Sequence, residues 1–482
     1  MLTSSADTPG IAIATGSAPS PRSTHRWWAL TVLALAQFLV VLDASIVNIA
    51  LPSLGSQLHL DTAALGWIIT AYVLPFGGLL LLGGRLADRL GHRRVFLIGV
   101  AGFIAASALA GLSISGGMLL TARALQGASA ALLAPASLAL VTHLFDGRDR
   151  AKALGIWGAV AGIGSAAGVL LGGVLTAAFG WQAVFFVNVP VGVLVIAVIP
   201  FLVTRDPRHA PERLDIAGAI TVTGGITAAV AALSQSAQLG WLHPVTLGLA
   251  AVAAALLIAF VVIERRSASP LVPFSFFRNR DASAGNLVML LVGGATTALF
   301  FALSVYLQDV LHYSALSAGL SQLPLAGSLV VIAGIVPSVV NRAGLRPTLV
   351  AALVVLAAGL VWLAVAGPQA SYLTGLLGPS ILVGIGLGAA FVTTTQLAVN
   401  GVALVDSGLA SGLVNTSQQI GGAIGLAALS TLAAAQTARL VSDGTAVDTA
   451  LAAGFAWVFL GGAALAIAGA IVTALLRRRR VS

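Results

Sequence analysis

Long uncharged apolar segments recur along the chain, separated by short stretches that carry charge or contain Gly, Pro and Asn. Each segment has about 20 residues, the length that an α-helix needs to cross the hydrocarbon core of a bilayer. The pattern predicts fourteen membrane-spanning helices and an all-α integral membrane protein. We place them at 27–50, 63–82, 95–113, 117–140, 153–175, 183–203, 215–234, 245–263, 284–307, 318–340, 347–367, 373–396, 409–433 and 453–476.

The composition agrees with a membrane protein and excludes several other classes. Charged residues make up 8% of the chain, against about 25% in soluble proteins, and mean hydropathy is +1.02. This argues against a soluble enzyme, a DNA-binding protein or a disordered polymer. The chain has no cysteine and its seven histidines show no metal-ligand spacing, so we expect no disulfide and no metal site.

The basic residues sort to one side of the predicted topology. Lys and Arg favour cytoplasmic loops, and all but two of the 24 lie on the side of the N-terminus. The two exceptions are Arg123, inside a span, and Arg439. The net charge of +9 therefore reflects topology and not a nucleic-acid partner. We expect a multi-pass protein of the plasma membrane with both termini in the cytoplasm.

An internal repeat divides the chain. Arg89, Gly91 and Arg93 follow span 2, and Arg342, Gly344 and Arg346 follow span 10 at the same offsets. Two related six-span halves with two helices inserted between them would produce this repeat. The predicted parts are a disordered tail at 1–26, a first bundle at 27–203, an inserted pair with a linker at 204–264, a linker and second bundle at 265–476, and a basic tail at 477–482.

Several motifs resemble the major facilitator superfamily, in particular its fourteen-span drug:proton antiporter branch. The resemblance covers nearly the whole chain and implies that fold and an antiport activity. The segments that carry it are the loop 84–94 (GRLADRLGHRR), span 1 at 42–52 (LDASIVNIALP), Arg123 with Gln126 and Gly127 in span 4, 214–218 (LDIAG), 306–308 (YLQ) and 411–416 (SGLVNT).

Two positions depart from that pattern. The span 5 antiporter motif of the family places Pro after a Gly, and here Val169 follows Gly168. Before span 6 the family reads Trp-Arg-Trp, and here the sequence is Trp181-Gln182-Ala183. The first departure weakens the inference of antiport and leaves an importer or a uniporter as an alternative.

Asp43 and Arg123 are the acidic and the basic residue that fall well inside predicted spans. Charges in the membrane are expensive and usually functional. Burial disfavours a carboxylate and a nearby arginine favours it, so we expect Asp43 to carry the transported proton and Arg123 to control its protonation. The alternative is a purely structural ion pair.

The loop after span 2 is interpreted as a latch that closes the cytoplasmic side, as the resemblance implies. Its residues are Gly84, Asp88, Arg89, Gly91 and Arg93. Glycines permit tight backbone geometry, and a carboxylate is favoured at the start of a helix. The alternative is a basic loop that only sets topology, which would explain the arginines but neither Asp88 nor the glycines.

Other candidates lie on helix faces. Span 5 carries small residues at spacings that allow close helix contact, namely Gly158, Gly162, Gly168, Gly172 and Gly173. They favour either static packing or a surface along which the two halves slide. Polar residues that could line a substrate cavity, or form helix–helix hydrogen bonds, are Gln37, Asn48, Trp67, Tyr72, Gln322, Thr394 and Gln418.

These observations favour a secondary transporter that exports small hydrophobic organic compounds, such as drugs or antibiotics, against protons. There is no phosphate-binding loop with Gly-Lys-Ser/Thr, so we expect no cofactor and no use of ATP. We expect a monomer in the lipid bilayer whose partners are its substrate and protons. A non-transporting membrane sensor is less favoured, because no predicted soluble part is longer than the N-terminal tail. No cluster of polar catalytic residues indicates an enzyme.

Overall fold

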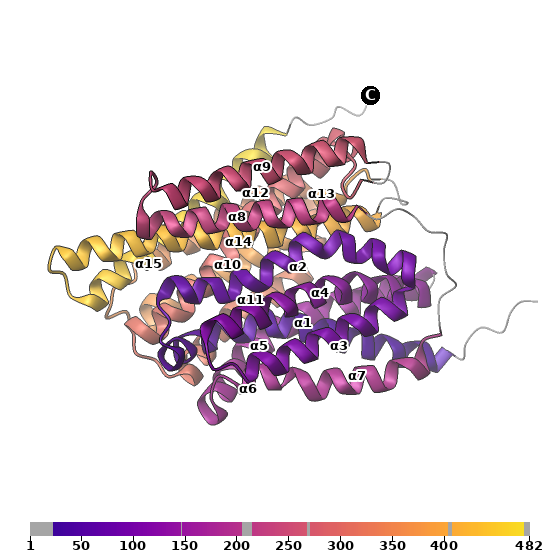
Figure 1. Ribbon diagram of the computed structural model, residues 1–482, viewed down its shortest axis with the longest axis horizontal. Helices are drawn as coiled ribbons and strands as arrows, with labels where there is room; N and C mark the ends of the chain where they lie inside the picture. Colours follow the sequence, from indigo (N-terminus) through magenta and orange to yellow (C-terminus); the bar gives the residue numbers. More distant parts are fainter. Residues whose placement is uncertain (1–22, 146, 205–214, 268–269, 403–406, 477–482) are drawn as a thin grey trace, which may run out of the picture.

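A computed structural model describes residues 23–145, 147–204, 215–267, 270–402 and 407–476. Within these ranges the regular structure is entirely helical (Figure 1). The helices of the first half are α1 (Ser23–Leu58), α2 (Thr62–Leu90), α3 (His92–Gly111), α4 (Gly116–Leu144), α5 (Gly147–Phe179), α6 (Ala183–Phe186) and α7 (Asn188–Leu202).

The remaining elements follow in the second part of the chain. They are α8 (Ile216–Leu239), α9 (Pro244–Arg266), η1 (Phe274–Arg278), α10 (Arg280–Val305), η2 (Tyr306–Val310), α11 (Ala315–Ala343), α12 (Leu345–Ala364), η3 (Tyr372–Leu376), α13 (Leu377–Val399), α14 (Ser407–Ser442) and α15 (Val447–Leu475).

Fourteen membrane crossings are present in the described residues, when α6 and α7 are counted together. Thirteen are long and apolar enough to span a bilayer. The fourteenth, α5, has 33 residues, and its sequence carries no charge from Ala153 to Phe179. Polar side chains fix several helix starts: Asp61 accepts a hydrogen bond from the backbone N–H of Ala64, and Ser115 from that of Met118. Such capping satisfies backbone donors that a helix leaves unpaired.

Three details differ from the sequence prediction. The segment 84–94 is helical except at Gly91, which alone separates α2 from α3. Span 6 is broken at Val187 between α6 and α7. Span 13 continues for nine residues past its predicted end, because α14 runs to Ser442 with no helix-breaking residue after Ala433. Of the predicted tail at 1–26, residues 1–22 lie outside the described residues and 23–26 form the start of α1. The predicted tail at 477–482 also lies outside the described residues.

The helices group into two halves with α8 and α9 along one edge. Figure 1 shows α1 to α7 on one side, α10 to α15 mostly on the other, and α8 and α9 next to α14. α8 contacts both α14 and α2, and Thr431 of α14 donates a hydrogen bond to the carbonyl of Leu233. The outer helix α9 exposes apolar side chains, among them Leu247 and Ile258, as expected of a lipid-facing surface. The boundaries of the predicted parts stay a prediction.

Equivalent glycines in the two halves have nearly the same backbone conformation. Gly91 has φ 92° and ψ 130°, and Gly344 has φ 88° and ψ 157°. A positive φ favours glycine, because a Cβ would be strained there. Each glycine joins the second helix of its half to the third, which is what a repeated unit would produce.

The two halves contact each other along α2 and α14 and, near one end of the bundle, through α1, α5, α10 and α11. We call the end where α1 begins and α15 ends the terminal end, and the opposite one the far end. At the far end, Ser304 of α10 donates a hydrogen bond to the carbonyl of Asn48 (2.5 Å), and Gln308 donates to that of Ile49 (3.0 Å). α5 and α11 also touch there, because a Cβ on Gly319 would lie 2.7 Å from the carbonyl oxygen of Val169.

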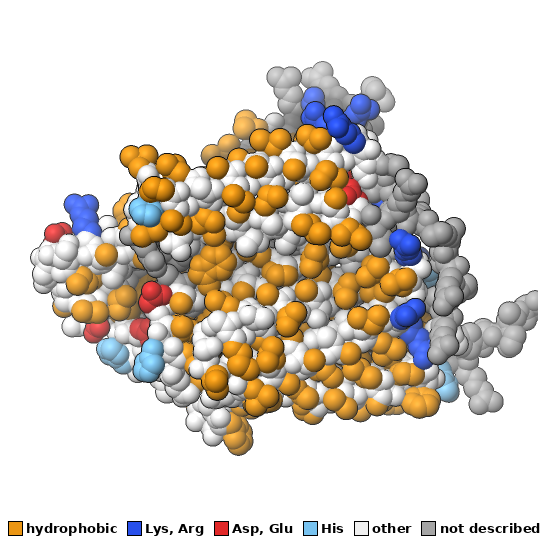
Figure 2. Space-filling model, viewed as in Figure 1, with side chains coloured by type: hydrophobic (Ala, Val, Ile, Leu, Met, Phe, Trp, Pro, Cys, Tyr) orange, Lys and Arg blue, Asp and Glu red, His pale blue; other side chains and the backbone are white. Residues whose placement is uncertain are grey.

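Toward the terminal end α11 is exposed on the face that meets α5, whereas α2 and α14 stay in contact: a Cβ on Gly412 of α14 would lie 2.8 Å from Cδ2 of Leu81 on α2. Pro337 lies five turns along α11 from Gly319 and therefore on the same face, yet it is exposed. A Cβ added at Gly327 or Gly334 would meet nothing within 4 Å. Contact between α5 and α11 is thus present at the far end, while α2 and α14 join the two halves toward the terminal end as well. Figure 2 shows hydrophobic side chains over most of one face, with most of the basic side chains gathered at one end.

Candidate functional site

Asp43 and Arg123 form an ion pair inside the first half. Arg123 Nη1 donates to Asp43 Oδ2 at 2.5 Å. The Asp43 side chain is 0% exposed and that of Arg123 is 1% exposed. The predicted pairing is therefore present, between α1 and α4. Removing one partner of such a pair costs about 3–5 kcal/mol, since the other charge is left buried alone.

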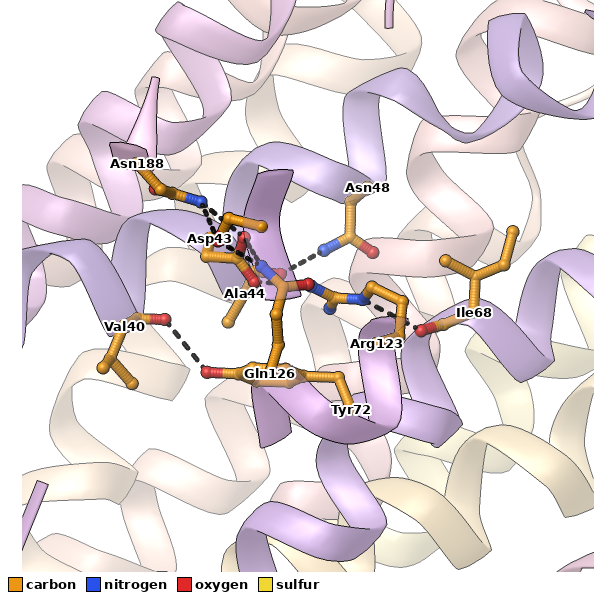
Figure 3. A network of polar contacts seen from close by, with 10 residues as sticks. Val40, Asp43, Ala44, Asn48, Ile68, Tyr72, Arg123, Gln126 and Asn188 are labelled. Atoms are coloured by element: carbon orange, nitrogen blue, oxygen red, sulfur yellow. Dashed lines mark hydrogen bonds and ion pairs between the residues drawn. The ribbon is translucent and has the colours of Figure 1, made fainter. Parts of the chain in front are cut away.

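Three further polar side chains complete the site (Figure 3). Gln126 accepts a hydrogen bond from Arg123 Nη1 (3.0 Å) and donates from Nε2 to Asp43 Oδ1 (3.0 Å) and to Ser107 Oγ (2.8 Å). Asn188 donates from Nδ2 to Asp43 Oδ1 at 2.8 Å and lies 3.4 Å from Ser107 Oγ. We call Asp43, Ser107, Arg123, Gln126 and Asn188 the buried polar cluster.

Backbone and aromatic groups hold the arginine of this cluster. Arg123 Nε donates to the carbonyl of Ile68 at 3.2 Å. The guanidinium lies over the ring of Tyr72, 4.4 Å from its centroid, and 5.9 Å from that of Phe185. Arginine over an aromatic face is favourable when water is excluded. Gly127 permits this approach of α4 to α2, because a Cβ there would overlap the carbonyl oxygen of Tyr72.

Sequence reasoning identified Asp43, Arg123 and Gln126, but it missed Asn188 and Ser107. Both are fully buried and come from α7 and α3, which are distant in sequence from Asp43. One signal could have pointed to Asn188. It is an amide in an apolar helix start, Val187-Asn188-Val189, and polar groups at such depth require a partner.

The cluster lies on the side of α1 that faces α4 and α7, inside the first half. Along α1, Gln37, Ala44 and Asn48 share one stripe at helical spacing, and Ala44 on that stripe is exposed. Asp43 is rotated from Ala44 by one residue, about 100°, and points toward α4 and α7 instead (Figure 3). Gln37 Oε1 and Asn48 Oδ1 on the stripe have no hydrogen-bond partner.

The other predicted cavity residues come from α2, α11, α13 and α14. Tyr72 lies beneath Arg123, where its hydroxyl donates to the carbonyl of Val40 at 3.4 Å, and it is not exposed to an opening. Gln322 and Thr394 are buried, and their Oε1 and Oγ1 atoms lack partners. Trp67 and Gln418 are half-buried on α2 and α14. No hydrogen bond joins these side chains to one another within the described residues, and the substrate cavity stays a prediction.

The glycines of α5 face different neighbours. A Cβ on Gly168 would lie 3.0 Å from the carbonyl oxygen of Leu42, and one on Gly172 would lie 2.8 Å from that of Ile46, both on α1. A Cβ on Gly173 would lie 2.8 Å from the carbonyl oxygen of Ala315 on α11, in the other half. The surroundings of Gly158 and Gly162 lie outside the described residues.

The segment predicted as a latch lies at the terminal end. Asp88 is largely exposed, and its Oδ1 lies 3.0 Å from Nε2 of His92, one turn further on. Arg85 of the same segment donates to the carbonyl of Pro270, in the chain that follows α9. Arg89 and Arg93 are also engaged in interactions, while a Cβ on Gly84 would meet Pro135 of α4 at 3.7 Å.

Comparison with known proteins gives concordant results. The profile of the Major Facilitator Superfamily matches residues 33–426. The chain is 40% identical to the puromycin resistance protein of Streptomyces alboniger, covering 95% of this chain and 91% of that protein. It is also 40% identical to the cephamycin export protein of Amycolatopsis lactamdurans, with 96% and 95% covered.

Solved structures resemble the fold at low sequence identity. A bacterial homologue of the human lysosomal transporter Spinster, in an inward-facing and unoccupied conformation, matches with a TM-score of 0.67 at 16% identity, covering 94% of this chain and 97% of that chain. An autoinhibited peptide transporter of the POT family matches with a TM-score of 0.68 at 18% identity, covering 94% and 98%.

Proposed function

The chain belongs to the Major Facilitator Superfamily, and on that premise we propose that it exports small hydrophobic antibiotics in exchange for protons. It is a multi-pass membrane transporter and not an enzyme. The names of its relatives, which refer to puromycin resistance and cephamycin export, support antibiotics as the substrate class. The buried Asp43–Arg123 pair is the observation that carries proton coupling.

Asp43 is the group that takes up the proton in this proposal. It is a carboxylate with a cationic partner and without access to water in this state, so a change in its charge must alter the packing around it. A proton that falls through about 100 mV releases about 2.3 kcal/mol. At about 1.4 kcal/mol per tenfold, one proton sustains about a forty-fold gradient of a neutral substrate.

In this proposal the terminal end faces the cytoplasm, and substrate enters between α5 and α11 from inside the cell. The placement of the basic residues supports this orientation. The protein lies in the plasma membrane, in contact with lipid, substrate and protons, as a monomer without a cofactor. The segment at 84–94 closes the cytoplasmic side when the bundle opens outward.

Transport by the purified protein in liposomes tests the proposal. With an imposed proton gradient, puromycin and a cephamycin should move uphill, opposite to the protons. The Asp43→Asn variant should lose uphill transport while it still binds substrate, because the amide cannot exchange a proton. Uphill transport by Asp43→Asn at the wild-type rate would refute coupling through this residue. Movement of substrate in the same direction as protons would identify an importer instead.

A further inference from the structure

We propose that Asn188 is a positioning residue that turns its side-chain amide when Asp43 is protonated. The inference rests on the proposed function, in which Asp43 carries the proton. It assigns to α7 a part in coupling that the sequence motifs do not indicate. The argument starts from the two ends of the Asn188 amide, which have different surroundings.

The nitrogen end of the amide is paired and the oxygen end is not. Nδ2 donates to Asp43 Oδ1 at 2.8 Å and lies 3.4 Å from Ser107 Oγ. Oδ1 is buried and has no hydrogen-bond partner, although the whole residue is 0% exposed. A buried acceptor without a partner is uncommon and costs free energy. The Asn188 side chain therefore carries an unused hydrogen-bond acceptor, Oδ1, on the same amide group whose Nδ2 contacts the Asp43 carboxylate.

The present arrangement suits an ionised Asp43. Oδ2 accepts from Arg123, while Oδ1 accepts from both Gln126 and Asn188. The titratable or charged side chains that face Asp43 within the described residues are Arg123 from α4 and Tyr72 from α2. Every group around the carboxylate donates, so a proton placed on Oδ1 would meet only other donors.

A half-turn of the Asn188 amide removes that conflict. A proton from water binds Asp43 Oδ1 and forms an O–H bond, which changes the carboxylate into a neutral acid. The turned amide presents its own oxygen, which accepts the hydrogen bond from this O–H and can accept another from the Ser107 hydroxyl. Gln126 Nε2 already donates to Ser107 Oγ, so the hydroxyl proton of Ser107 is available.

The turn has a consequence for α7. The amide nitrogen, a donor, would then point to the buried place where the acceptor Oδ1 now lies without a partner. The ionised and the protonated cluster therefore place opposite hydrogen-bonding groups against the same surroundings and favour different packing there. Asn188 thus converts a change of charge at Asp43 on α1 into a change in the preferred packing of α7.

Infrared difference spectroscopy of the full-length protein in lipid tests this without a substrate. The carbonyl band of protonated Asp43 is identified by its loss in Asp43→Asn. In Asn188→Leu, which has a similar shape but neither donor nor acceptor, the band should move to higher frequency, since the acid has lost its acceptor. Its pH midpoint should rise by about one unit, because a hydrogen bond to a charged group is stronger than one to a neutral group.

Two more variants keep the test decisive. Asn188→Asp retains the volume and an acceptor but adds a like charge, so the pH midpoint should rise further, and it serves if Asn188→Leu does not fold. Asn286→Leu is the matched control, because it removes a buried amide of α10 in the other half; it should leave the band unchanged.

The possible failures can be told apart. A band in Asn188→Leu with wild-type frequency and midpoint would overturn the role of Asn188, even if Asp43→Asn abolishes uphill transport. If the pH midpoint of the band rises in Asn188→Leu but its frequency stays unchanged, the proposal is also overturned. Asn188 would then act only as a hydrogen-bond donor to ionised Asp43. Uphill transport by Asp43→Asn would refute the proposed function itself.

Discussion

Asp43 and Arg123 depend on each other, because neither side chain reaches water in this structure. The guanidinium makes a planar set of bonds: Nη1 reaches Asp43 and Gln126, and Nε reaches the carbonyl of Ile68. A lysine has one ammonium group on a flexible stem and cannot reproduce this set. The identity of the cation is therefore as important as its charge.

Substitutions of Arg123 test that dependence. We expect Arg123→Ala to lose coupled transport, since Asp43 would remain buried without its cation. Arg123→Lys should retain part of the activity with a shifted pH optimum, because one point charge replaces the fork. The measurement is the rate of uphill transport against pH. Identical pH profiles for Arg123→Lys and the wild type would show that the fork has no role in coupling.

Unlike the buried side chains of Asp43 and Arg123, the side chain of Asp88 is 71% exposed. An exposed ion pair contributes at most about 1 kcal/mol to stability, so Asp88→Asn should fold and insert normally. We nevertheless expect slower transport, because the proposed latch acts in the state closed to the cytoplasm. Asp443→Asn, an exposed carboxylate at the far end, is the matched control. Wild-type rates in well-expressed Asp88→Asn would contradict the latch.

Among the elements, α5 shows how a departure from the motif is accommodated. It is one continuous helix through Val169, and the carbonyl of Val169 lies against Gly319 of α11. A proline at 169 would remove the bond from its N–H to the carbonyl of Ser165. That carbonyl already accepts a hydrogen bond from the Ser45 hydroxyl, at 2.9 Å. The neighbouring helix α1 is thus prepared for the family's usual residue.

We therefore expect Val169→Pro to be tolerated better than a proline elsewhere in α5. Leu171→Pro is the control, because no side-chain donor reaches the carbonyl of Ala167 within the described residues. It should lose about 3 kcal/mol, and Val169→Pro clearly less. Thermal unfolding in detergent measures both. Equal losses would show that the Ser45 bond does not compensate.

For the whole molecule, the two halves are joined by α2 against α14 and by contacts at the far end. Several far-end contacts use backbone carbonyls and glycines: Ser304 and Gln308 bond to carbonyls of α1, and Gly173 faces Ala315. When the two halves move apart, these contacts leave only neutral polar groups exposed, and water can hydrogen-bond to them. No buried charge is exposed by their separation. This is suited to an interface that must open and close in each transport cycle.

The orientation of the molecule can be tested by labelling, since the chain has no cysteine. Ser442→Cys, at the far end of α14, should react with an impermeant reagent added outside intact cells. Ser275→Cys, exposed in η1 near the terminal end, should react only after the membrane is opened. The reverse pattern would invert the proposed topology and with it the side from which substrate enters.

Local sequence features determined the spans, the basic side and the two membrane charges. About twenty apolar residues suffice to specify a membrane helix. The bilayer core offers no hydrogen-bond partners, so the backbone N–H and C=O groups must pair with each other within the segment. A lone Asp or Arg in such a segment stands out for the same reason, and its pairing could be expected from depth alone. Motif resemblance added Gln126 and Gly127, which lie where the sequence placed them.

Tertiary structure decided which side chains meet. Asn188 and Ser107 reach Asp43 only because α7 and α3 pack behind α1 and α4, and hydropathy does not encode the rotation of a helix that is apolar on all sides. The same limit explains why Tyr72, which was predicted as a cavity residue, lies beneath Arg123 of the buried polar cluster. Likewise, the places at which the two halves touch depend on packing between helices that are distant in sequence.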